Sequence, residues 1–284
     1  MKIYCQMMTV YNALKWAAVQ LQVSCKRPQF EAELLLAYHL KKERIWLMTH
    51  PDTAVKNLNF FTSLVARRAM HEPYEYIVGE ASFYDIHLAV EKGVLIPRPE
   101  TETLIDITTE IIKREKITRI AEIGVGSGAI SIVLARKFPQ LYIVATDIEE
   151  KPLQVTAKNI VKYGVEAQIT LQKSNLIDKV DKNIEMVVSN PPYIAENASL
   201  ESNVIDHEPH SALFGGKIGD ELLKQIITDV NKRGIRWLVC EMGYDQKRSI
   251  EVFVNKIEIQ SINFYKDLSG HDRGFVVDFG VSSI

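Results

Sequence analysis

From Thr118 onward, short apolar segments alternate with amphipathic ones, and this alternation restricts the possible folds more than any other feature. The apolar segments predict strands at 118–123, 141–146, 168–172, 184–189, 236–241, 259–264 and 274–279. The amphipathic segments predict helices at 128–137, 151–163, 220–232 and 245–256. Strands that alternate with helices form a mostly parallel sheet covered by helices on both faces. The prediction is therefore an α/β fold with a seven-stranded, mostly parallel, doubly wound sheet.

The first 73 residues show a different pattern, in which apolar side chains recur at the spacing of a helix face. Val10, Leu14 and Ala17 form one such stripe, and Thr9 in front of them is suited to cap a helix. Stripes of this kind indicate a packed core and do not indicate a catalytic or binding function. We therefore expect a small helical domain over residues 1–73.

Residues 74–97 change character again, because apolar side chains stand among polar residues and glycines, as in a β-hairpin. The segment ends at Pro97-Arg98-Pro99, and a helix is expected from about Glu100 to Lys113. The predicted organisation is a helical N-terminal domain at 1–73, a β-hairpin linker at 74–97 and an α/β domain at 98–284.

Composition excludes several classes of protein. The 284 residues carry a net charge of −2, which argues against a broad nucleic-acid surface. Three cysteines, Cys5, Cys25 and Cys240, are widely spaced and match no metal-ligand pattern, which suits a reducing compartment. The first ten residues show no signal-peptide pattern, and no apolar run approaches the roughly 20 residues that cross a bilayer. We expect a cytoplasmic protein without a metal.

The string Asn190-Pro191-Pro192-Tyr193 follows the apolar strand at 184–189. Proline has no backbone N–H, so the chain must leave the sheet here as a stiff loop. Asn190 supplies a side-chain carbonyl, the prolines supply backbone carbonyls, and Tyr193 supplies a flat ring. Two acceptors and a ring face suit a planar –NH2 group, although a plain exit from a strand is an alternative.

Residues 124–128, Gly-Val-Gly-Ser-Gly, join the strand at 118–123 to a helix. The glycine spacing is neither the dinucleotide fingerprint nor a phosphate-binding loop. Asp147, at the end of the next strand, is placed to accept both hydroxyls of a ribose, with a helix N-cap as the alternative. Glu122 could hold an amino group or satisfy N–H groups of the loop. These features predict a nucleoside-binding site that lacks a phosphate-binding loop.

This combination resembles the class I S-adenosylmethionine methyltransferases, which have a Rossmann-like fold. The resemblance narrows to the peptide chain release factor glutamine N5-methyltransferase family, of HemK or PrmC type. It is carried by segments in the same order, namely Glu75–Phe83, Leu95–Glu102, Asn190–Tyr193, Glu208–Gly216 and Asp267–Arg273. Members of the family methylate the glutamine of the Gly-Gly-Gln motif in class I release factors. The resemblance implies S-adenosylmethionine as the cofactor and a release factor as the protein partner, with the helical domain docking it.

The resemblance also implies roles for individual residues. The cofactor would be held by Glu122, Gly124, Val125, Gly126, Ser127, Gly128, Asp147, Asn175, Leu176 and Asn190. The glutamine would be held by Asn190, Pro191, Pro192, Tyr193, Phe83, Arg98 and Glu100, and the catalytic residues among them would be Asn190, Pro191 and Tyr193.

Two departures concern cofactor affinity. Val125 stands where the family usually has threonine, and Asn175 stands where it usually has an acid. His207 and His210 form a poor metal pattern, and the better interpretation of their loop is a cover over the substrate.

Alternatives remain open. They are an adenine-N6 methyltransferase acting on DNA or RNA, a glutamine methyltransferase acting on a ribosomal protein, and a cofactor-binding module without activity. A monomer is expected.

Overall fold

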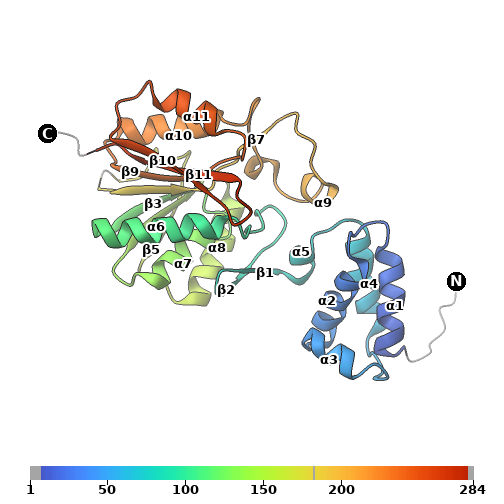
Figure 1. Cartoon of the computed structure of the whole chain (residues 1–284). Coiled ribbons are helices and arrows are strands. Elements are labelled where there is room, and N and C mark those ends of the chain that lie inside the picture. The colour runs from blue at the N-terminus through green and yellow to red at the C-terminus, as the bar shows by residue number, and fades with distance from the viewer. Residues whose placement is uncertain (1–7, 182, 281–284) are drawn as a thin grey trace. The chain divides into compact units, whose positions relative to one another are not determined.

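The computed structural model describes residues 8–181 and 183–280, so Cys5 lies outside the described residues. The chain divides into two compact units (Figure 1). One unit consists of Met1–Gly79 and Glu201–His207, and the other of Glu80–Leu200 and Glu208–Ile284. A short segment from the second half of the sequence therefore belongs to the N-terminal unit, which the sequence pattern did not indicate.

The N-terminal unit is helical. Its helices are α1 (Val10–Leu21), α2 (Pro28–Leu40), α3 (Arg44–Thr49), α4 (Leu58–Ala69), α5 (Tyr74–Val78) and α9 (Ser202–Ile205). The Thr9 side chain accepts a hydrogen bond from the backbone N–H of Asn12, so the predicted cap of α1 is confirmed. Fully buried side chains from four of these helices, including Leu21, Leu35, Leu47 and Phe61, form a separate hydrophobic core.

The hairpin is shorter than the linker expected from the sequence. Residues 74–78 form α5, and the strands are β1 (Glu80–Phe83) and β2 (Ile86–Ala89). The fully buried side chain of Asn159 exchanges two hydrogen bonds with the backbone of Ala89 and donates a third to the Ser127 carbonyl. One amide thereby joins the hairpin to the glycine loop.

The second unit is built on the seven-stranded sheet that the alternation predicts. The strands are β3 (Arg119–Ile123), β4 (Tyr142–Asp147), β5 (Ile169–Lys173), β6 (Met186–Ser189), β9 (Trp237–Glu241), β10 (Ser261–Lys266) and β11 (Asp272–Asp278). Their order is β10-β11-β9-β6-β3-β4-β5. The pairs among β9, β6, β3, β4 and β5 are parallel, and β11 is antiparallel to both of its neighbours.

Helices cover both faces of this sheet (Figure 1). Five of them are long, namely α6 (Thr101–Glu115), α7 (Ala129–Lys137), α8 (Glu150–Tyr163), α10 (Glu221–Lys232) and α11 (Lys247–Val254). Successive strand residues point to opposite faces, so Val188 joins the core beneath α6 to α8 while Val187 joins the core beneath α10 and α11. The α/β prediction is confirmed.

The order of the strands reverses between β3 and β6. From β3 the chain proceeds to β4 and β5 on one side, and from β6 it proceeds to β9 and the last two strands on the other. Ligands in sheets of this kind bind beyond the carboxyl ends of the strands at such a point. Smaller elements lie after β6: strand β7 (Ile194–Ala195), a 3-10 helix at His210–Ala212 and strand β8 (Phe214–Gly216).

Within residues 8–181 and 183–280, no helix is both long and apolar enough to span a membrane.

Candidate active site

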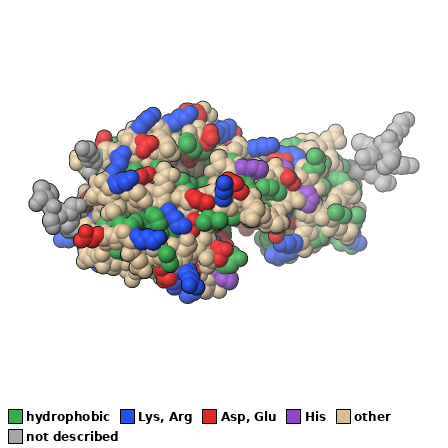
Figure 2. All heavy atoms as spheres, turned by 90° about the horizontal axis from the view of Figure 1, so that it is seen from above, with side chains coloured by type: hydrophobic (Ala, Val, Ile, Leu, Met, Phe, Trp, Pro, Cys, Tyr) green, Lys and Arg blue, Asp and Glu red, His purple; other side chains and the backbone are tan. Residues whose placement is uncertain are grey.

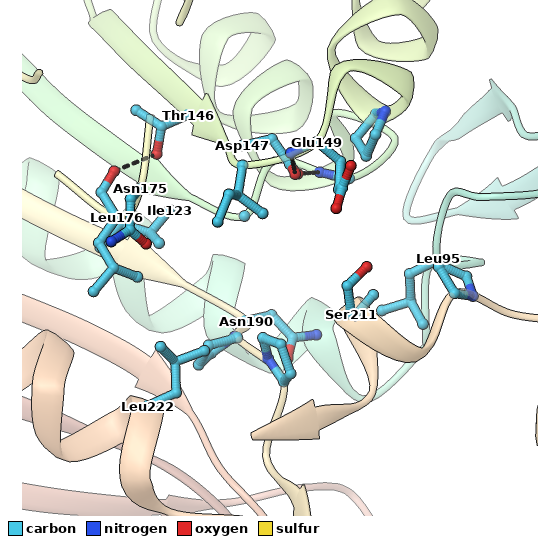
Figure 3. Close-up of a pocket in the computed structure, with 18 of the residues that line it drawn as sticks. Leu95, Ile123, Thr146, Asp147, Glu149, Asn175, Leu176, Asn190, Ser211 and Leu222 are labelled. Atoms are coloured by element: carbon cyan, nitrogen blue, oxygen red, sulfur yellow. Dashed lines mark hydrogen bonds between the residues drawn. The ribbon is translucent and has the colours of Figure 1, made fainter. Parts of the chain in front are cut away.

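A cavity of about 320 Å³ lies at the carboxyl ends of β3, β4 and β6 (Figure 3). One part of its wall comes from the loops after β3, β4 and β5, and includes Gly124, Gly126, Asp147, Glu149, Asn175 and Leu176. Another part comes from the loop after β6, the hairpin side and the 3-10 helix, and includes Leu95, Asn190, Pro191, Pro192, Pro209, Ser211 and Phe214. The two parts are called the cofactor half and the acceptor half below.

The glycine loop contributes backbone to the cofactor half. A Cβ atom added to Gly124 or Gly126 would meet no heavy atom within 4 Å, so the cavity side of both residues is open to a ligand. Thr156 on α8 supports the loop from behind by donating to the Gly126 carbonyl at 2.9 Å.

Gly128 lies outside the cavity wall, at a close contact between two helices. It precedes α7, and a Cβ atom there would lie 2.8 Å from the Thr156 methyl group. Only glycine allows α7 and α8 to approach this closely. Val125 and Ser127 are also buried and, like Gly128, are not part of the cavity wall.

Asp147 faces the cavity at the end of β4 (Figure 3). Its Oδ2 atom accepts from the Gly126 N–H at 3.2 Å, and its Oδ1 atom accepts from the Glu149 N–H at 3.0 Å. Burial, the largest influence, raises the pKa of the Asp147 carboxyl, while the two backbone donors lower it. Each carboxylate oxygen keeps acceptor capacity for a ligand hydroxyl.

Glu122, the residue before the end of β3, lies behind the cavity wall. Its carboxylate accepts from both the backbone N–H and the hydroxyl of Ser131 on α7, and the side chain is 1% exposed. Burial raises the pKa of Glu122 to about 8. In this structure the carboxylate binds Ser131 in the first turn of α7, rather than an N–H group of the glycine loop as one of the two expected roles had it.

Asn175 and Leu176 both line the cofactor half. Leu176 has a positive φ of 46°, a conformation that costs energy for a bulky residue and recurs at functional sites. Its carbonyl accepts from the Thr146 hydroxyl at 3.0 Å, which holds the strained turn against β4. The Asn175 side chain is exposed at the cavity mouth and offers both an amide donor and an acceptor.

Asn190 is the polar centre of the acceptor half. Its Nδ2 atom donates to the Thr101 hydroxyl at 2.9 Å, so the Oδ1 atom is left to accept a bond from a ligand. Thr101 begins α6 and is 4% exposed. The sequence analysis did not select Thr101, although it lies within the Leu95–Glu102 segment that carried the resemblance.

Pro191 and Pro192 line the cavity, but Tyr193 does not. The Tyr193 hydroxyl donates to Glu241 Oε1 at 3.0 Å, its carbonyl accepts from Gln246, and its ring packs against the core beneath α10 and α11. Burial raises the pKa of the Tyr193 hydroxyl, which therefore stays a donor. The expected ring wall for the amide is absent from this arrangement of the described residues.

Gly215, in the segment after the 3-10 helix, lies close to the proline-containing loop. A Cβ atom on Gly215 would lie 2.4 Å from the Pro192 carbonyl oxygen, so only glycine lets β8 pack against the Asn190–Tyr193 loop. Strand β8 pairs with β7. The Asn190–Tyr193 loop, called the proline loop below, is therefore anchored by β6 at its start and by the β7–β8 pair at its end.

Arg98 and Glu100, expected near the substrate, are not part of the cavity wall. Arg98 pairs with the Glu208 carboxylate, which also accepts from the Ile96 N–H at 3.1 Å. Since Leu95 and Pro209 are wall residues, this ion pair fixes two wall segments to each other. Glu100 is the residue before α6, and its side chain makes no capping bond.

Phe83 is 2% exposed and packs in the core beneath α6 to α8, so the structure gives it a packing role away from the cavity. Among the described residues, no group of three or more His, Cys, Asp or Glu side chains could hold a metal ion.

Comparisons with known proteins agree with this geometry. A family model described as "PrmC N-terminal domain" matches residues 12–79, and one described as "Methyltransferase small domain" matches residues 101–263. The release factor glutamine methyltransferase of Clostridium botulinum is 34% identical over 256 residues, which cover 86% of this chain and 90% of that protein. The protein of the same name from Dictyoglomus turgidum is 37% identical over 250 residues, which cover 86% and 88%.

Among solved structures, the catalytic domain of hMettl16 in complex with MAT2A 3′UTR hairpin 6 has a TM-score of 0.58 with 15% sequence identity. The match covers 78% of this chain and 81% of that one. At this identity the likeness shows the class I methyltransferase fold alone.

Proposed function

The chain belongs to the release factor glutamine methyltransferase family, and from this premise we propose that it methylates the glutamine of the Gly-Gly-Gln motif in class I peptide chain release factors. The methyl group comes from S-adenosylmethionine and is transferred to the side-chain amide nitrogen, N5. The observation that carries the proposal is the orientation of Asn190, whose Oδ1 atom is left for an acceptor amide because Thr101 binds Nδ2.

The cofactor half suits S-adenosylmethionine. Asp147 offers a carboxylate to the two ribose hydroxyls, and the open backbone at Gly124 and Gly126 admits the methionine part. Asn175 lies where the adenine edge would be read, and an amide can both donate to and accept from adenine. We propose that Glu122 acts on the cofactor only through α7, because its carboxylate is bound to Ser131.

The acceptor half suits a carboxamide. An amide –NH2 group has two hydrogens, and we assign them to Asn190 Oδ1 and the Pro191 carbonyl. These two acceptors fix the plane of the amide and aim its nitrogen into the cofactor half. Orientation of this kind supplies a large share of many rate enhancements.

When bound, S-adenosylmethionine supplies an electrophilic methyl group on a sulfonium. Held by Asp147 and the glycine loop, this group would give its methyl carbon to the amide nitrogen; the carbon–sulfur bond would break and a neutral thioether would remain. The two acceptors stabilise the positive charge that develops on nitrogen. The alkylated nitrogen is strongly acidic and releases its proton to water, so no side chain has to act as a base before the transfer.

The N-terminal unit is proposed to dock the protein substrate. Its segment Glu201–His207 follows the proline loop along the chain, and Lys26 pairs with Glu201 at 2.6 Å while His207 bonds the Met70 carbonyl at 3.1 Å. A substrate protein that contacts the helices would therefore contact a segment that leads directly into the Glu208–Phe214 wall. We infer a monomer that acts in the cytoplasm, where release factors work.

Nucleic acid is not the proposed acceptor. Lys and Arg side chains are interspersed with Asp and Glu on the face shown in Figure 2, and the net charge is −2. Adenine also carries a planar –NH2 group, however, so an adenine acceptor is included in the test.

The test is incubation of the protein with labelled S-adenosylmethionine and, separately, a class I release factor, a ribosomal protein and DNA. Label in the release factor, located by mass spectrometry on the glutamine of Gly-Gly-Gln, is the expected result. Label in the ribosomal protein or DNA alone would contradict the proposal.

A further inference from the structure

We propose that Thr101 is a positioning residue that selects which end of the Asn190 carboxamide faces the acceptor, and that Glu241 sets the direction of the Thr101 hydroxyl. The inference rests on the proposed function, and it assigns two residues, on α6 and β9, that do not touch the substrate themselves.

The first step is the contact between Asn190 and Thr101. A carboxamide can present either its oxygen or its –NH2 group, and only the oxygen can accept a bond from a substrate amide. The 2.9 Å bond from Asn190 Nδ2 to the Thr101 oxygen selects the productive orientation. Without that acceptor, the Asn190 carboxamide could rotate by half a turn. Its –NH2 group would then face the –NH2 group of the substrate glutamine.

The second step is the direction of the Thr101 hydroxyl. Its oxygen already accepts from Asn190, so its single hydrogen is free to point elsewhere. The Thr101 hydroxyl is close enough to the Glu241 carboxylate to lower the pKa of that group by hydrogen bonding. Glu241 is 1% exposed, and its Oε2 atom has no hydrogen-bond partner among the described residues, so a buried acceptor remains available for the Thr101 hydrogen.

The third step is the surroundings of Glu241. Burial raises its pKa to about 7, and Thr101, Tyr193 and Arg273 oppose that rise. Arg273 is itself held by Asp267 at 2.8 Å, which gives the Asp267–Arg273 segment a place in the network. The titratable or charged groups that face Glu241 come from the proline loop, from strands β9, β10 and β11, and from the start of α6, and they are Tyr193, Cys240, Tyr265, Arg273 and Glu100.

An ionised Glu241 accepts from Tyr193 through Oε1 and offers its unpaired Oε2 to the Thr101 hydrogen, which leaves the Thr101 oxygen for Asn190. A protonated Glu241 instead has a proton to donate to Thr101, whose own hydrogen then turns toward Asn190. The Asn190 carboxamide then rotates, so that Oδ1 faces Thr101 and the –NH2 group faces the substrate. The turnover number should therefore rise as pH increases through about 7.

The experiment compares Thr101→Val, Thr101→Ser and Glu241→Gln with the wild-type protein, using release factor as the acceptor. The control is Thr108→Val, which removes another buried hydroxyl from the same helix, one that bonds only the Leu104 carbonyl. Turnover number, KM for release factor, the dissociation constant for cofactor, thermal unfolding and the pH profile are measured for each.

We expect Thr101→Val to lower the turnover number about 10-fold, the scale of one hydrogen bond, with cofactor affinity unchanged. Thr101→Ser keeps the hydroxyl and should stay close to the wild-type rate, as should Thr108→Val. Glu241→Gln should lower the turnover number by a similar factor at pH 8. Its turnover number should also no longer rise with pH near 7.

A wild-type rate in Thr101→Val would overturn the inference, and so would a loss in Thr101→Ser as large as in Thr101→Val. If Thr101→Val does not fold, the serine and glutamine variants still decide through their rates and pH profiles. Failure of the wild-type protein to methylate release factor is a separate outcome, because it contradicts the proposed function rather than the network.

Discussion

The Arg98 guanidinium pairs with the buried carboxylate of Glu208, 110 residues further along the chain. The Glu208 side chain is 1% exposed, and its second oxygen accepts from the Ile96 N–H. Residues next to both partners, Leu95 and Pro209, form part of the cavity wall. The shape of the acceptor half therefore depends on one ion pair that lies outside it.

Replacing Arg98 with alanine should leave the Glu208 charge buried and unpaired, which costs about 3 kcal/mol of stability when an ion pair is broken on one side. The catalytic efficiency toward release factor should fall more than the affinity for cofactor, because the loosened segments belong to the acceptor half. Chemical denaturation and steady-state kinetics measure the two effects. Lys158→Ala is the control, since its exposed pair with Glu91 should contribute less than about 1 kcal/mol. Equal losses of stability and catalytic efficiency in the two variants would show that the Arg98–Glu208 ion pair does not hold the cavity wall in place.

Replacing Asn190 with alanine should lower the rate of methyl transfer by about 10²-fold or more, on the scale of losing one preorganised group that stabilises developing charge. The dissociation constant for S-adenosylmethionine should change little, because Asp147 and the glycine loop remain intact. Single-turnover kinetics and calorimetry separate the two quantities. Near-normal turnover in this variant would remove Asn190 from the mechanism.

Replacing Asp147 with asparagine should weaken cofactor binding by about 10-fold or more, since a bond from a ribose hydroxyl to a charged acceptor is worth more than one to a neutral acceptor. The turnover number at saturating cofactor should stay within a few-fold of wild type. Titration calorimetry with S-adenosylhomocysteine measures the affinity, and Glu150→Gln, three residues along the chain, is the control. An unchanged affinity in Asp147→Asn would mean that the ribose binds elsewhere.

Replacing Glu122 with glutamine should stabilise the protein at high pH. The folded-state pKa of about 8 lies above the ordinary glutamate pKa of 4.5, so between these values the folded state holds a proton that the unfolded state has released. Wild-type stability therefore falls as pH rises from about 4.5 to about 8, and glutamine removes that loss. We expect an advantage on the order of 2 kcal/mol at pH 8.5 that shrinks toward pH 5, measured by denaturant unfolding.

The exposed Glu166→Gln is the control for that series, and its difference from wild type should be small at both pH values. A pH-independent effect of Glu122→Gln would show that the buried carboxyl is not the titrating group. Weaker cofactor binding in the same variant would return Glu122 to the direct cofactor role that the resemblance implied.

The sheet could be predicted from the sequence because short, largely apolar segments alternate with helical patterns along the chain. All seven predicted strands begin within two residues of the observed start; β6, for example, was expected at 184 and begins at Met186. Helix α5 was not predicted, because five residues are too few to show a helical period. The membership of Glu201–His207 in the N-terminal unit depends on contacts between distant segments, which local patterns do not contain.

The candidate site was predicted where position alone decides. Asp147 ends β4 and Asn190 follows β6, and both strands are parallel to β3 between them, so both residues had to lie at the same edge of the sheet. The direction of a side chain is set by its partners, and for Tyr193 and Glu122 those partners are Glu241 and Ser131. Glu241 ends strand β9 at the same edge, so the rule that found Asp147 could also have found it.

The structure of this protein with S-adenosylhomocysteine and a peptide containing Gly-Gly-Gln tests the central claim most directly. The account predicts that the glutamine nitrogen lies within hydrogen-bonding distance of both Asn190 Oδ1 and the Pro191 carbonyl, with its lone pair directed at the cofactor sulfur. A glutamine side chain bound outside this cavity, or an Asn190 –NH2 group facing the substrate amide, would contradict it.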